Sequence, residues 1–273
     1  MMGIQIVILW SDLLIWLLVA AGIGVGLLIA RDPPLLSAWR RVGANRVGMA
    51  SATVLLAFIV IGLLDSLHYR VALEGKPGQK VQYAIEVLSL LDAVATPLRT
   101  RSEKTYSEPF ATRLYAKETI DVPGRGSVRD YPRLKHGGAG LADPQADWTG
   151  DVARRLITGL AFGGLAAAAL RLAMRRRLAA EQTVAWHAAW WTGAILMMLV
   201  SLTMALTWGQ GYHVLGTDRT GNDVLYVALK SVRTAFVIGS LATVATLPLA
   251  LALGIAAGYF KGWVDDVIQY IYT

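Results

Sequence analysis

The side chains best suited to chemistry form one polar cluster, HVLGTDRTGNDVL at positions 213–225, which lies between two long apolar runs. Gly216 and Gly221 permit turns, and the Thr and Asp side chains between them can bond nearby backbone amides. Asn222 or Asp223 can cap a following helix. From these residues alone the cluster is interpreted as a structural turn, with direct contact to a partner as the alternative.

Other patterns that would indicate catalysis or metal binding are missing from the sequence. It has no GxxxxGK[ST] nucleotide loop and no HExxH motif, and the lack of cysteine excludes thiolate catalysis and Cys-based metal sites. The histidines lie far apart in sequence, so we interpret each as a surface or interface residue rather than a ligand. They are His68, His136, His187 and His213. The prediction is a protein with no cofactor, no metal and no catalytic residue.

The composition indicates an integral membrane protein. Only 16% of the 273 residues are charged and 55% are hydrophobic, whereas soluble proteins carry about 25% charged residues. The net charge of +7 could suggest nucleic acid, but the excess lies mostly beside the apolar runs. Arginines there favour the cytoplasmic side of a membrane, so no nucleic-acid partner is predicted. The two clusters are Arg31, Arg40, Arg41 and Arg46, and Arg171, Arg175, Arg176 and Arg177.

Five stretches with almost no charge approach or exceed the roughly 20 residues that cross a bilayer. We expect spans at 13–30, 47–64, 156–173, 183–208 and 235–260. Pro33 and Pro34 should end the first span, and Pro248 should kink the fifth because it removes a backbone donor. A sixth apolar segment begins at Val264 and stops too early to cross, so the chain resembles the N-terminal part of a longer protein.

Counting crossings from the basic loops places the N-terminus and residues 65–150 outside the cytoplasm. TIDVPGRGSVRDY at 119–131 predicts two short strands around a Pro-Gly turn. Earlier in this region, apolar residues at helical spacing predict an amphipathic helix. That face comprises Val81, Ile85, Leu88 and Leu91.

The predicted fold class is an all-α polytopic membrane protein with about five complete transmembrane helices, the start of a sixth, and a small periplasmic α+β insert. A further amphipathic helix at 223–232, with Lys230 and Arg233 opposite its apolar positions, should lie on the membrane surface before the fifth span. Three GxxxG pairs in three spans should bring helix backbones close together. They are Gly22–Gly26, Gly159–Gly163 and Gly254–Gly258.

The last quarter of the chain, about 203–273, resembles the early part of the permease subunits of peptide and nickel ABC importers. Those proteins carry a His-Pro-Leu-Gly-Thr-Asp, two residues, Gly-Arg-Asp element outside the membrane, then a Gly-Tyr-Phe ending and a Gly-Trp-x-Asp stretch inside. The matching positions are His213, Leu215, Gly216, Thr217, Asp218, Gly221 and Asp223, then Gly258, Tyr259, Phe260, Gly262, Trp263 and Asp265. Val214 and Asn222 stand where the family has Pro and Arg.

The resemblance implies a non-enzymatic permease subunit in a bacterial inner membrane, forming the path for peptides or similar small solutes. Its partners would be a second permease subunit, cytoplasmic ABC ATPases that hydrolyse ATP, a periplasmic substrate-binding protein and the lipid bilayer. A periplasmic gate or docking loop would contain His213, Gly216, Thr217, Asp218, Gly221 and Asp223, and a cytoplasmic turn would contain Gly262, Trp263 and Asp265.

The chain then divides into a two-helix membrane extension at 1–64, the insert at 65–150, the third and fourth helices at 151–210, and the start of the permease domain at 211–273. The alternative is a membrane-anchored periplasmic binding or assembly protein in which the insert carries the function. An intramembrane enzyme is disfavoured because the spans contain almost no ionisable side chains.

Overall fold

A computed structural model describes residues 3–73, 81–122, 126–178, 183–260 and 262–272. Five of the described helices are long and apolar enough to cross a bilayer. They are α1 (Trp10–Arg31), α3 (Arg46–Asp65), α6 (Trp148–Leu178), α7 (Thr183–Thr207) and α8 (Val224–Phe260). Each covers its predicted span, α7 to within one residue, which confirms the prediction of a multi-pass helical membrane protein.

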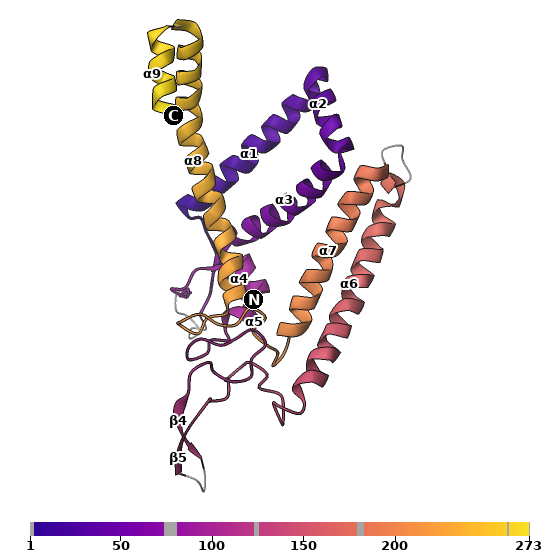
Figure 1. The fold of residues 1–273 in the computed structure, drawn as a ribbon, viewed down its shortest axis with the longest axis vertical. Coiled ribbons are helices and arrows are strands. Elements are labelled where there is room, and N and C mark those ends of the chain that lie inside the picture. Colours follow the sequence, from indigo (N-terminus) through magenta and orange to yellow (C-terminus); the bar gives the residue numbers. More distant parts are fainter. Residues whose placement is uncertain (1–2, 74–80, 123–125, 179–182, 261, 273) are drawn as a thin grey trace.

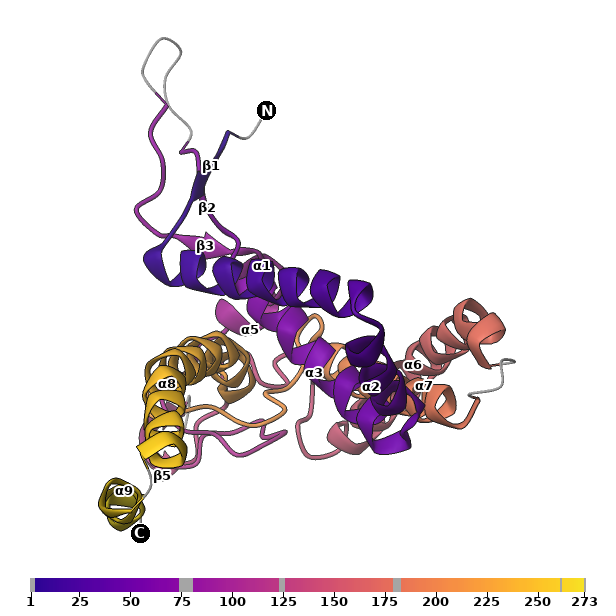
Figure 2. The same ribbon diagram turned by 90° about the horizontal axis from the view of Figure 1, so that it is seen from above.

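The helices pack as a hairpin of α6 and α7, with α3 against α7 and α8 against α3 and the start of α1. Figure 2 shows α1 and α3 lying across the space between α8 and the α6–α7 hairpin. Close approach of α6 and α7 depends on two glycines. A Cβ added to Gly159 would lie 2.9 Å from Leu202 Cα, and one added to Gly163 would lie 3.0 Å from Met198 Cα.

Among the described residues, Gly159–Gly163 is the only one of the three predicted GxxxG pairs that forms a packing contact between helices. A Cβ added to Gly22, Gly26, Gly254 or Gly258 would meet nothing within 4 Å. The spacing alone therefore did not identify which helices lie together.

Two shorter helices sit at the end of the molecule that carries the arginine clusters. The first span ends at Arg31, as predicted, but Pro33 begins a further helix, α2 (Pro33–Ala44), because proline is well tolerated in a first helical turn. α9 (Trp263–Tyr272) follows α8. Figure 1 shows α2, the C-terminal end of α6 and the start of α9 toward one end, and the insert toward the other.

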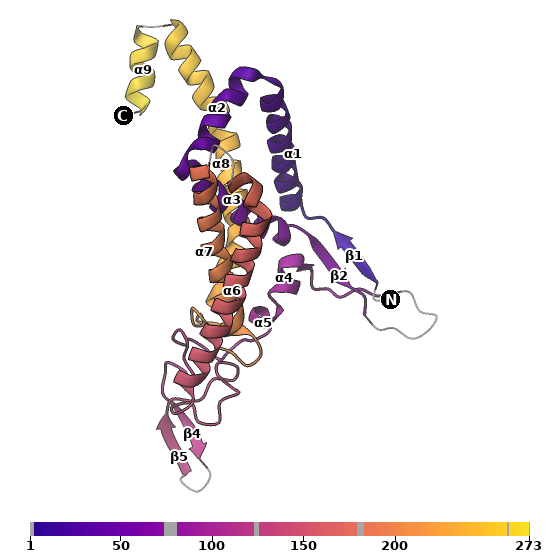
Figure 3. The same ribbon diagram turned by 90° about the vertical axis from the view of Figure 1, so that its right-hand side faces the viewer.

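The insert contains two short helices, a strand hairpin and two strands that form a small sheet with a strand from the N-terminal segment. β1 (Ile4–Val7), β2 (His68–Val71) and β3 (Leu88–Ser89) form an antiparallel sheet in that order, followed by α4 (Leu90–Val94) and α5 (Thr96–Arg99). β4 (Glu118–Val122) and β5 (Gly126–Asp130) form the predicted hairpin, whose turn lies outside the described residues. Figure 3 shows this hairpin projecting beyond the ends of the helices.

The prediction of a long amphipathic helix in the insert was wrong. Leu88 pairs with Tyr69 in the sheet, and the helix begins only at Leu90, after Ser89 and Asp92 form a reciprocal capping box. Ile85 is 95% exposed whereas Leu91 is buried, so the predicted residues do not form one buried face. Strand pairing with β2 overrides the helical spacing here.

The predicted surface helix at 223–232 was also wrong as a separate element. Residues Val224–Phe260 form one continuous helix that passes through Pro248. Its two basic residues, Lys230 and Arg233, form ion pairs with acidic side chains of the protein, as described below.

Candidate functional site at the foot of α8

The polar cluster predicted from sequence forms one tight turn that is packed against the insert. Gly216 and Gly221 have φ of +73° and +80°, a backbone conformation that side chains disfavour. A Cβ on Gly216 would collide with the carbonyl oxygen of Ser107, and one on Gly221 with that of Glu103. These two glycines therefore let residues 103–107 lie directly against the turn.

His213 lies between two carboxylates at the centre of this contact. Its Nδ1 is 2.7 Å from Asp223 Oδ2 and its Nε2 is 3.4 Å from Glu103 Oε1. Burial alone would lower the pKa of His213, but the two carboxylates outweigh it and raise the pKa to about 9. The raised pKa favours the protonated imidazole at neutral pH, and both ring nitrogens contact a carboxylate. His213 therefore fits a structural role, linking two carboxylates, better than the role of a general base.

Glu103 is held in its charged form by more than His213. Burial alone would raise its pKa, but the hydrogen bond with His213 and three backbone N–H donors lower the pKa to about 2. The three donors, within 2.7 to 3.1 Å, are Lys135, His136 and Gly137. Glu103 therefore connects the turn to a second loop of the insert.

The remaining members of the cluster shape the turn and begin α8. The Thr217 hydroxyl donates to the Thr105 carbonyl oxygen at 2.8 Å. Asp218 Oδ1 accepts the N–H of Asn222 at 2.9 Å. Asp223 Oδ1 accepts the N–H of Leu225 at 2.9 Å, which confirms the prediction of a helix cap at this position.

A second polar group, which the sequence did not reveal, surrounds Lys230 on α8. Lys230 Nζ is 2.7 Å from Asp65 Oδ1 at the end of α3 and 3.1 Å from Asp92 Oδ1 in α4. Asp92 also accepts the hydroxyl of Tyr226 at 2.7 Å. Both carboxylates are buried, so the lysine neutralises charges that would otherwise be strongly unfavourable.

Arg233, one turn further along, connects α8 to α1. Its Nη2 is 2.5 Å from Asp12 Oδ1, and the other oxygen of Asp12 is 2.9 Å from His68 Nδ1 in β2. Asp12 is 1% exposed. We call the side chains around His213, Lys230 and Arg233 the foot junction. Asp12 and Asp65 lie at the ends of apolar spans, and a carboxylate in that position needs a charged or hydrogen-bonding partner. These two residues are the sequence signal from which the junction could have been predicted.

The interpretation of all four histidines as surface or interface groups was wrong for two of them. His68 and His213 are buried members of the foot junction. His136 contacts Glu103 through its backbone N–H, and His187 lies within α7. Among the described residues, no group of three His, Asp or Glu side chains is placed to hold a metal ion.

The other predicted site residues lie at the far end of α8 or within it. Gly262, with φ of +63°, turns the chain between α8 and α9, and Trp263 begins α9 and is 76% exposed. Asp265 lies in the first turn of α9. The structure therefore separates the predicted outer loop from the predicted cytoplasmic turn by the length of α8 (Figure 1).

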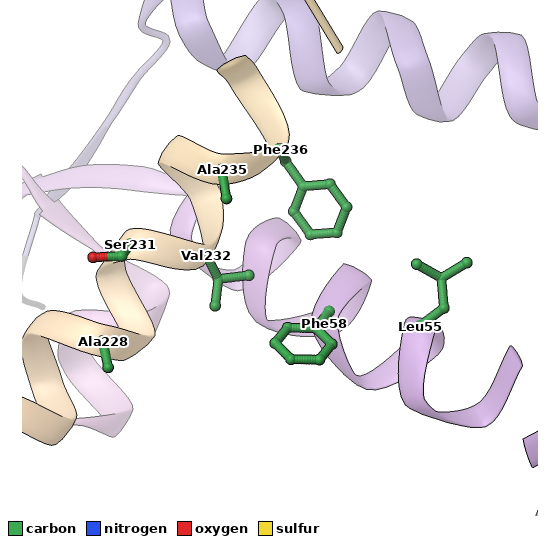
Figure 4. Close-up of a pocket in the computed structure, with 7 residues that line it drawn as sticks. All are labelled: Leu55, Phe58, Ala228, Ser231, Val232, Ala235 and Phe236. Carbon is green, nitrogen blue, oxygen red and sulfur yellow. The ribbon is translucent and has the colours of Figure 1, made fainter. Parts of the chain in front are cut away.

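An apolar groove of about 460 Å³ lies between α3 and α8, close to the foot junction. Figure 4 shows Phe58 of α3 facing Val232 of α8 across it, with Phe236 nearby. The lining residues are Leu55, Phe58, Ala228, Ser231, Val232, Ala235 and Phe236. The junction therefore holds α8 by charge, while the packing beside it is incomplete.

Comparison with protein families, with curated proteins and with solved structures found no match to this chain.

Proposed function

We propose that this chain is a permease subunit of a bacterial ABC importer, which forms part of an inner-membrane path for peptides or similar small solutes. The observation that carries the proposal is the way α8 is held. Its polar attachments lie within its first turns, at Asp223, Lys230 and Arg233. None of its 37 residues is buried.

The free length of α8 is the surface that further transport helices would cover. At 1.5 Å per residue the helix is about 55 Å long, against roughly 30 Å for the hydrocarbon layer. Gly254 and Gly258 are open to close approach by another helix, since an added Cβ there would meet nothing within 4 Å. A second permease subunit fits this requirement.

The turn at 213–223 supports a docking role through its exposed members. Leu215 is 48% exposed, and Arg219 and Asn222 are also exposed. His213 and Asp223 are buried, so they fix the shape of the turn rather than touch a partner. In this proposal a substrate-binding protein contacts the exposed residues, and separate ATPase subunits at the other end of α8 supply the energy.

Crosslinking from α8 tests the proposal, because these 273 residues contain no cysteine and a single introduced one is unique among them. Ile255→Cys on α8 should crosslink to a second permease subunit in detergent-purified complexes that contain an ATPase. Ile23→Cys, which is similarly exposed on α1, is the matched control and should not. A complex without an ATPase, or equal crosslinking from both positions, would contradict the proposal.

The projecting β4–β5 hairpin favours one other candidate, a membrane-anchored binding or assembly protein. Val128 is 38% exposed, and no strand residue with a described burial belongs to the buried apolar core. Deleting residues 118–130 separates the candidates. An anchored binding protein would lose its partner, whereas a permease subunit would keep its ATPase-containing complex.

A further inference from the structure

A groove between α6 and α7 differs in chemistry from the apolar groove beside α8. It has a volume of about 730 Å³ and lies where α6 begins and α7 ends. Along α6 the lining passes from Arg154 through Thr158 to Phe162, and along α7 it passes from Trp208 through Met204 to Ser201. The lining includes Arg154, Thr158, Phe162, Ser201, Met204 and Trp208.

The lining at the polar end contains two arginines and no acidic residue. Arg154 Nη2 is 2.6 Å and Arg155 Nε 2.7 Å from the Asp151 carboxylate, so two guanidiniums share one carboxylate. Asp151 also accepts the hydroxyl of Tyr212 at 3.1 Å. The nearby Asp147 carboxylate is directed to the backbone N–H of Asp143, at 3.1 Å.

The two arginines differ in what remains available for a ligand. Arg155 also donates Nη1 to the carbonyl oxygens of Ala205 and Trp208, at 3.1 and 2.8 Å, where it closes the C-terminal end of α7. The side chain of Arg154 is 74% exposed and has one described hydrogen bond. Its other guanidinium donors can therefore face an anion bidentately.

The other end of the groove extends along α6 toward the middle of its candidate membrane span. Phe162 lies eight residues after Arg154 on α6, which is about 12 Å along the helix axis. Phe162 is 69% exposed, and Met204 and Trp208 line the facing side of α7. Trp and Arg at the end of a span are typical of the membrane interface, which is where a lipid headgroup lies.

We propose that this groove binds an anionic phospholipid, with its phosphate on Arg154 and one acyl chain along Thr158 and Phe162. The arginine lies at the level expected for a lipid headgroup, and Phe162 lies at the level expected for an acyl chain. A phospholipid could therefore bind in the orientation that it has in a bilayer leaflet. Binding here is independent of the transport proposal. It would bridge α6 and α7 beside their close contacts at Gly159 and Gly163.

Native mass spectrometry of the detergent-purified full chain tests the site, with phosphatidylglycerol and phosphatidylcholine as probes. Wild type should retain phosphatidylglycerol in preference. Arg154→Gln should weaken its binding about tenfold, the effect of losing one charge-assisted contact. Thr158→Trp should fill the groove and weaken both lipids. Arg129→Gln removes an equal charge from the exposed hairpin and should change neither.

Several results would overturn the proposal. Equal retention of the two lipids would remove the anionic preference, and an equal loss in Arg129→Gln would show general charge attraction. Displacement of phosphatidylglycerol by millimolar inorganic phosphate would show a free-anion site. If Arg154→Gln does not fold, Arg154→Lys and Thr158→Trp carry the test. Arg154→Lys should bind phosphatidylglycerol with intermediate affinity, and unchanged lipid binding in both variants would contradict the site.

Discussion

Lys230 Nζ lies 2.7 Å from Asp65 Oδ1, so the foot of α8 is joined by charge to the last residue of α3. The Asp65 side chain is 2% exposed and that of Lys230 is 32% exposed. The lysine therefore extends its ammonium to a buried carboxylate from the edge of the junction. Removing the ammonium would leave two buried carboxylates, Asp65 and Asp92, close to each other.

Lys230→Met should lower the free energy of unfolding by roughly 1–3 kcal/mol, less than for a fully buried pair because the lysine is partly exposed. Thermal unfolding in detergent measures the change. Lys104→Met is the matched control, since the Lys104–Glu118 pair is largely exposed and should contribute less than about 1 kcal/mol. Equal losses in the two variants would contradict a special role for the foot junction.

Stability should depend on pH through His213 and Glu103. The pKa of His213 is raised to about 9, so its contribution is complete below about pH 6.5 and is lost as pH rises through about 9. The pKa of Glu103 is lowered to about 2, so its contribution is complete above about pH 4.5 and is lost as pH falls through about 2. Thermal unfolding from pH 3 to pH 10 should therefore show a maximum between these limits.

His213→Gln is the control for the alkaline side of that profile. It removes the titrating group, so the loss of stability between about pH 6.5 and pH 9 should disappear. The loss of stability at acidic pH should persist in part through Asp92 and Asp218. Burial alone would raise the pKa of Asp92, but hydrogen bonds lower it, and hydrogen bonds also lower the pKa of Asp218. An unchanged alkaline slope in this variant would show that another group is responsible.

Gly221→Ala and Gly216→Ala should each destabilise the turn strongly. Both combine a positive φ with a collision against the backbone of the insert, and a backbone obstacle cannot move as a side chain can. Gly209→Ala isolates the conformational part, because Gly209 has φ of +64° and open space around an added Cβ. That control should lose only about 1 kcal/mol. Limited proteolysis of the insert would report the difference.

Gly159→Leu should separate α6 from α7. An added Cβ already lies 2.9 Å from the Leu202 Cα, and a larger side chain would force the backbones apart. Gly164→Leu, on the same helix, meets nothing within 4 Å and should be tolerated. Disulfide trapping between cysteines placed at Phe162 and Ser201 measures the approach of the two helices. Similar trapping in both variants would show that the glycine contact is unimportant.

The sidedness of the molecule is open to direct labelling. Single cysteines at Arg40 and Arg176 should react from the cytoplasmic side, because arginine-rich turns are retained there. A cysteine at Arg129 in the hairpin should react with an impermeant reagent added to intact spheroplasts. Opposite labelling of Arg40 and Arg176 would contradict the arrangement in which both basic turns lie at one end.

The long helices were predictable from the sequence, and most of the insert was not. A run of about 18 or more uncharged residues has one stable form in lipid, so spans such as 235–260 follow from length and composition. Leu88 had helical spacing with its neighbours, yet it pairs with Tyr69, which lies 19 residues earlier. The spacing of apolar residues within one segment cannot predict pairing with a strand elsewhere in the chain.

The same limit applies to the candidate site. Two glycines and a capping Asp identified the turn at 213–223, and its local form agrees with the structure. Glu103 lies 110 residues from His213 in sequence, and nothing in either segment predicts that they meet. Lys230 and Arg233 were recognised as basic positions, but their buried acidic partners come from three separate elements.

Because α8 is fixed at its foot and no residue along it is buried, the helix has the geometry of a lever. Over a length of about 55 Å, a tilt of roughly 5° at the foot moves the far end by about 5 Å. Slight repacking around Lys230 and Arg233 is thereby magnified at Phe260. A small displacement of the turn at 213–223 would therefore be enlarged at the other end of α8.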